Sequence, residues 1–225
     1  MIFRRRRRSD DADEALEAAE RDELGELDAE RPRGPWDRSE TDADTTDPDY
    51  IDLGGLVVRG RPTLEVRLQV DEATAAVGGV LLAMPDSGLE LRAFAAPRSS
   101  GIWDDVRADI AAEAGRQGGT ATELDGEFGT ELKVVVPVVL PDGRPATQIS
   151  RIVGVDGPRW LLRGTFLGRS AEEPDPEGEL ESAFRDVIVV RGDAAMKPRD
   201  MLEMHMPQQV EIALGEELDE GDDDD

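Results

Sequence analysis

Residues 147–167 read TQISRIVGVDGPRWLLRGTFL, and this stretch decides the fold. Asp156-Gly157 is a dipeptide typical of tight hairpin turns, and it separates two runs rich in β-branched and large apolar residues. We therefore predict two antiparallel strands, from about Thr147 to Val155 and from about Arg159 to Leu167.

The turn also predicts a register for this hairpin. If Val155 lies opposite Pro158, then Arg151 lies opposite Leu162. Successive side chains of a strand point to opposite faces, so the register defines two faces. The first face is apolar and carries Ile149, Val153, Trp160, Leu162 and Phe166. We expect helices to cover it.

The second face of the hairpin is mixed. It carries Ser150, Ile152, Arg159, Leu161, Arg163 and Thr165. Two arginines beside apolar residues make Arg159 and Arg163 a candidate patch for an anion or a partner protein. The alternative is that nearby acidic side chains neutralise both arginines.

Further strands flank this hairpin in the sequence. A run from about Thr130 to Leu140 precedes it and completes a three-stranded meander, with Pro137 indicating an edge strand or a bulge. Upstream, residues 64–70 alternate, and residues 80–84 and 89–95 form a second hairpin. Residues 186–190, DVIVV, indicate a last buried strand.

Two helices are expected among these strands. Trp103, Val106, Ile110 and Ala114 form one apolar stripe, with Ser99 or Ser100 as a possible cap and Gly118 as the end. A shorter helix is expected from about Pro176 to Arg185. This order lacks βαβ alternation, so we predict an α+β fold: a mainly antiparallel sheet of about six to seven strands backed by two helices on one face.

Charge divides the 225-residue chain, whose formal net charge is -26, into three parts. Residues 4–8 are five arginines, and residues 9–49 carry 17 acids and 4 arginines. This composition cannot bury enough apolar surface to order itself, so we predict a disordered arm over 1–49, a single α+β domain over 50–207 and an acidic tail over 208–225. Trp36, an isolated large apolar residue in the arm, is a docking residue, a solvent-exposed side chain or a side chain that folds back on the core.

The sequence lacks the residues that several kinds of catalytic and metal sites require. Cysteine is absent, His205 is the single histidine, and no glycine-rich phosphate loop occurs. Met201, Met204, His205 and Met206 offer copper ligands, but methionines at this spacing more often pack. Asp104, Asp105 and Asp109 are expected to be solvated. We therefore predict no catalytic, metal or cofactor residues.

The acidic composition and the hydropathy pattern also predict surroundings and partners. A negative field opposes binding of duplex nucleic acid by the core. No apolar run has the roughly 20 residues of a membrane-spanning helix. We expect a cytoplasmic protein with a protein partner; the oligomeric state is left open.

Four motifs resemble an uncharacterised actinobacterial family known only as a domain of unknown function. They are FAAPRSSGIWDDVR (94–107), FGTEL (128–132), VGVDGPRWLLRG (153–164) and FRDVIVVRGDAAMKPRD (184–200). The resemblance covers roughly residues 50–207. It implies a GC-rich source, which explains 24 arginines beside two lysines, and it implies no activity or cofactor.

Three hypotheses of function follow. The first is a non-catalytic cytoplasmic protein-binding or adaptor module. The second is a carboxylate- and Mg²⁺-dependent enzyme acting on a small phosphorylated or nucleotide substrate. The third is attachment to a membrane surface or nucleic acid through Arg4–Arg8.

Overall fold

The computed structural model describes residues 34–70, 76–98 and 101–207. Ser99 and Ser100, the Arg4–Arg8 run and the predicted 208–225 tail lie outside these ranges. The helices are η1 (Arg38–Glu40, a 3-10 turn), α2 (Trp103–Arg116), α3 (Arg169–Glu172) and α4 (Glu179–Arg185). The strands are β1 (Trp36–Asp37), β2 (Tyr50–Asp52), β3 (Leu56–Arg59), β4 (Glu65–Val70), β5 (Val77–Ala83), β6 (Ser87–Ala95), β7 (Thr120–Gly126), β8 (Gly129–Val139), β9 (Pro145–Gly157), β10 (Trp160–Gly168) and β11 (Ile188–Val189).

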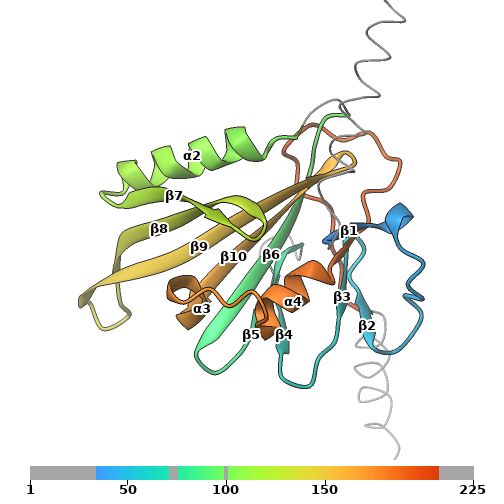
Figure 1. The fold of residues 1–225 in the computed structure, drawn as a ribbon, viewed down its shortest axis with the longest axis horizontal. Helices are drawn as coiled ribbons and strands as arrows, with labels where there is room; N and C mark the ends of the chain where they lie inside the picture. The colour runs from blue at the N-terminus through green and yellow to red at the C-terminus, as the bar shows by residue number, and fades with distance from the viewer. Residues whose placement is uncertain (1–33, 71–75, 99–100, 208–225) are drawn as a thin grey trace, which may run out of the picture.

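A seven-stranded antiparallel sheet forms the body of the molecule, in the order β4-β5-β6-β10-β9-β8-β7 (Figure 1). A smaller sheet, β1-β11-β3-β2, packs beside it. The α+β class, the number of strands in the large sheet and the β8-β9-β10 meander are as predicted. Strands β1, β2, β3 and β7 and the short helix α3 have no counterpart in the sequence prediction.

The register of the β9-β10 hairpin differs from the prediction. Leu162 lies opposite Val155 rather than Arg151, because the strands stay paired as far as Gly157 and Trp160. The turn is therefore Pro158-Arg159, in which Arg159 has a left-handed φ of 66°. The pairing moved by an even number of residues, so the predicted faces keep their members except Arg159, which lies in the turn.

The two main helices lie on opposite faces of the large sheet, which corrects the prediction that both cover one face (Figure 1). Helix α4 packs on the apolar face, where Leu180 and Phe184 join Phe166 in the main core. Helix α2 packs on the mixed face, where Ile152 and Leu161 are buried beneath it. The mixed face thus contains enough apolar surface at its β8-β9 end to hold a helix.

The folded chain begins before Tyr50, the predicted boundary. Strand β1 pairs in parallel with β11, and the backbone N–H of Trp36 donates to the carbonyl of Val187 over 2.9 Å. The indole Nε1 of Trp160 donates to Asp37 Oδ2 over 2.7 Å. Residues 34–49 are therefore part of the fold and not of a disordered arm, because a core side chain has its hydrogen-bond partner there.

Residues 199–204 pair with the part of β6 that β5 does not reach. The N–H of Ala95 donates to the carbonyl of Asp200 over 2.8 Å, and the N–H of Leu202 donates to Ala93 over 2.9 Å. Leu202 and Met204 are both buried, and Met204 forms isolated bridges with Gly54 and Val77.

Candidate functional site

Helix α2 is fixed to the sheet at its first residue. Gly154 leaves room for the Trp103 ring, which a Cβ at that position would overlap. The Trp103 indole Nε1 donates to the carbonyl of Thr130 over 2.8 Å. From β9, the carboxylate of Asp156 accepts the backbone N–H of Ile102 over 2.8 Å and that of Trp103 over 3.1 Å. A distant carboxylate thus caps the helix, where negative charge is favoured.

A groove of about 360 Å³ runs between α2 and strands β6 and β10. This volume falls in the range of ligand-binding pockets. Its lining residues are Phe94, Ile102, Val106, Asp109, Ile110, Glu113, Arg116, Arg163 and Arg199. Its apolar residues are buried or half-buried, whereas Asp109, Glu113, Arg116 and Arg199 have more exposed side chains, so the groove is amphipathic.

Arg163 is the poorly neutralised cation of this groove. Its Nε is buried without a hydrogen-bond partner, and its ion pair with Glu90 spans 3.9 Å. Glu90 bonds closely elsewhere, to Arg92 Nε over 2.7 Å and Gln69 Nε2 over 2.9 Å. Burial, followed by the charge of Arg92, lowers the pKa of Arg163. The guanidinium lies 5.5 Å from the centre of the Phe94 ring.

The other cations of the groove have close carboxylate partners. Arg199 donates to Asp109 over 2.7 Å, and Arg116 Nε donates to Glu113 over 2.9 Å. Both arginine side chains are also more exposed than that of Arg163. A ligand anion is therefore expected to meet its least competition at Arg163.

The structure separates Arg159 from Arg163. Arg159 is half-buried in the β9-β10 turn, outside the groove lining, and its charge contributes, after burial, to lowering the pKa of Arg191. Trp36, the predicted docking residue, is half-buried in β1.

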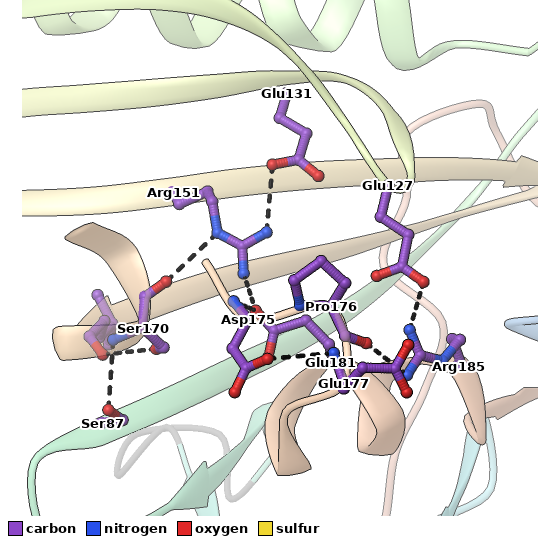
Figure 2. Close-up of polar contacts among 11 residues, drawn as sticks. Ser87, Glu127, Glu131, Arg151, Ser170, Asp175, Pro176, Glu177, Glu181 and Arg185 are labelled. Carbon is purple, nitrogen blue, oxygen red and sulfur yellow. Dashed lines mark hydrogen bonds and ion pairs between the residues drawn. The ribbon is translucent and has the colours of Figure 1, made fainter. Parts of the chain in front are cut away.

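A buried ionic cluster on the other face of the sheet has no counterpart in the sequence prediction (Figure 2). Arg151 donates to Glu131 over 3.2 Å and to Glu181, and all three side chains are only 4% exposed. The Arg151 guanidinium also lies 3.8 Å from the centre of the Phe166 ring. Strand alternation carried the signal, because it places Arg151 between two residues of the apolar face.

Glu131 carries the unbalanced charge of this cluster. Its Oε1 is buried without a hydrogen-bond partner, and burial raises its pKa, although Arg151 opposes the shift. The backbone of Gly126 lies directly against the carboxylate, which a Cβ there would overlap. The cluster is therefore closed by strand packing and joins β8, β9 and α4.

The metal-ligand and acidic residues considered in the sequence analysis do not form a site in the structure. Within the described ranges, no group of three or more His, Cys, Asp or Glu residues is placed to hold a metal ion. Met201 is 41% exposed whereas Met204 is buried, so the two thioethers have different surroundings. Asp104, Asp105 and Asp109 are mostly exposed on α2.

Within the described part of the chain, no helix is both long and apolar enough to cross a membrane.

Comparison with known proteins identifies the family. No curated protein matches the chain. Four solved chains match, among them a crystal structure from Bacteroides thetaiotaomicron VPI-5482 at 1.50 Å resolution, with 13% identity and a TM-score of 0.39. That match covers 74% of this chain, which spans 56% of the other. A family model described as a protein of unknown function, DUF3710, matches residues 34–213, so the chain belongs to the DUF3710 family.

Proposed function

We propose that this chain is a non-catalytic, cytoplasmic protein-binding module whose α2 groove holds an apolar partner segment carrying a carboxylate. The observation that supports this most is Arg163. Its side chain lines an apolar groove, is 22% exposed and has only a 3.9 Å ion pair with Glu90, so an anion in the groove would complete its charge balance.

The charge balance around Arg163 favours a carboxylate as that anion. Arg92 and Arg163 share Glu90, which leaves about one positive charge for a ligand. Arg199 and Arg116 are neutralised by Asp109 and Glu113, so the groove offers no further free positive charge to a more highly charged group. A single carboxylate matches the planar guanidinium in charge and shape.

The layout of the groove favours a protein segment as the ligand. Phe94, Ile102 and Val106 are buried or half-buried and offer apolar contacts, while the more exposed pairs Arg199–Asp109 and Arg116–Glu113 offer polar ones. Protein interfaces combine buried apolar residues with more exposed polar residues in this way.

Peptide display tests the proposal. A library of random peptides is selected on the full chain, and one selected peptide is synthesised with its acidic residue intact or replaced by the matching amide. We expect apolar peptides with one acid, and binding weakened about tenfold or more by the amide, since a charged hydrogen bond contributes about 1.5–3 kcal/mol.

Variants of the chain locate the site. Arg163→Gln should weaken binding as much as the amide peptide does, and Arg163→Lys should restore part of it. Arg159→Gln, which changes an arginine outside the groove, is the matched control. If Arg163→Gln bound the peptide as tightly as the wild-type chain, Arg163 would not contact the carboxylate. If Ile110→Asp also bound it as tightly, the groove would not be the binding site.

A further inference from the structure

The β8-β9 hairpin extends beyond the rest of the large sheet. Strand β7 pairs with β8 only as far as Val135, and β10 pairs with β9 only as far as Ser150. Strands β8 and β9 continue to pair with each other out to Val139 and Pro145. Residues 136–148, here named the β8-β9 arm, thus form a two-stranded ribbon that projects at the lower left of Figure 1.

The arm exposes apolar side chains. Val139 is 75% exposed, the largest value among the exposed large hydrophobic residues of the described ranges, and its neighbour Leu140 is 37% exposed. Pro137 lies on the exposed part of the ribbon as well. An isolated two-stranded ribbon is only marginally stable in water, so the arm would gain from a surface that covers these side chains.

The arm is electrically neutral in a strongly acidic chain. Its charged residues are Asp142 and Arg144, whose side chains bond to each other over 2.6 Å. The whole chain has a formal net charge of -26. Two copies would therefore repel each other less through their arms than through an acidic surface.

We infer that the β8-β9 arm binds the arm of a second copy of this chain around a two-fold axis. A two-fold contact uses the same patch on both subunits, so an apolar ribbon without net charge is self-complementary by chemistry. A partner protein that binds through a charged surface would find no net charge on the arm to bind.

The arms would meet through side chains and not through a continued sheet. Pro137 has no N–H to donate to a further strand. It lies in the part of β8 that does not pair with β7, so it occupies the edge position that the sequence predicted. Val139 of one copy therefore packs on the facing arm together with Pro137, which lies on the same face of β8 and is also exposed.

Ionic strength gives this dimer a distinctive signature. Salt screens the repulsion between two acidic chains but leaves apolar contacts in place. The dimer should therefore tighten as salt is added, whereas a contact built on ion pairs would loosen.

Sedimentation equilibrium of the full chain tests the inference at several protein concentrations and two ionic strengths. We expect a monomer–dimer equilibrium that salt shifts toward dimer, and a dissociation constant at least about tenfold higher for Val139→Thr combined with Leu140→Thr. Threonine keeps the β-branched shape that suits a strand.

Val70→Thr combined with Leu124→Thr is the matched control, because those side chains are 46% and 43% exposed on the two edge strands of the sheet. The control should dimerise like the wild-type chain. A monomer at every concentration and salt level would overturn the inference, even if the arm bound a different protein. An arm variant that dimerises normally, or a dimer that dissociates as salt is added, would overturn it as well.

Discussion

Gly154 shows how a single residue decides where α2 can lie. A methyl group there would overlap the Trp103 ring, so Gly154→Ala should force the ring away and destabilise the fold by about 1–3 kcal/mol. Urea unfolding measures this change. Gly115→Ala is the control: nothing lies near a Cβ at that helical position, and alanine favours helix, so stability should rise by about 0.5–1 kcal/mol. Unchanged stability of Gly154→Ala would refute the close packing.

Glu131 should make stability fall as pH rises. Its pKa is raised above the ordinary value of 4.5 in the folded state, so the folded protein holds a proton that the unfolded chain has already released. This contribution is fully present below 4.5 and is lost as pH rises through the raised value. Glu131→Gln removes the titration, so the stability of the variant relative to wild type should increase with pH in urea unfolding measured across the acidic and neutral range.

Glu179 provides a control of opposite sign. Its hydrogen bond from Arg61, and then that from Thr63, lowers its pKa below 4.5. That contribution is present above 4.5 and is lost as pH falls through the lowered value. The stability of Glu179→Gln relative to wild type should therefore increase as pH falls. If both variants shifted in the same direction, the assignment of the buried charge to Glu131 would be wrong.

At the scale of the element, Asp156 carries the attachment of α2. Asp156→Asn keeps the size of the side chain but removes the charge that accepts two N–H groups, and should cost about 1 kcal/mol of unfolding free energy. Urea unfolding followed by tryptophan fluorescence reports this loss. Asp104→Asn, an 88% exposed acid in the same first turn, should change stability far less. Equal effects would mean that the dipole alone, and not the contact from β9, holds the helix start.

The elements also show what could be predicted from the sequence. Alternation along β9 and β10 predicted the faces of the paired residues correctly, because a side chain's face depends only on parity, but it placed Arg159 on a strand when it lies in the turn. The turn was placed too early, because Asp156-Gly157 is typical of turns but here extends the pairing, and Asp156 serves as a cap. The sequence could not predict which face of the sheet each helix covers, because that depends on which apolar surface α2 packs against in the folded chain. Arg163 was identified as a candidate, whereas its groove exists only once α2 is placed.

At the scale of the whole molecule, the fold includes residues that their composition assigned to a disordered arm. Residues 37–49 hold six acids and one arginine, and the two-residue β1 is too short for any periodicity. What orders the segment is distant in sequence: β11 pairs with β1, and Trp160 needs Asp37 as an acceptor. Composition therefore misplaces the boundary, since it measures only what a segment can bury by itself.

Two truncated chains test where the fold begins. A chain of residues 50–207 loses β1 and the hydrogen bond from the fully buried Trp160 to Asp37, and a hydrogen bond to a charged group contributes about 1.5–3 kcal/mol. A chain of residues 34–207 keeps both. We expect the longer chain to unfold at the same urea concentration as the full chain and the shorter one at a clearly lower concentration. Asp37→Ala in the full chain removes the hydrogen bond but keeps strand β1, so its urea midpoint should lie between those of the two truncated chains. If the shorter chain were as stable as the longer one, the fold would begin at Tyr50.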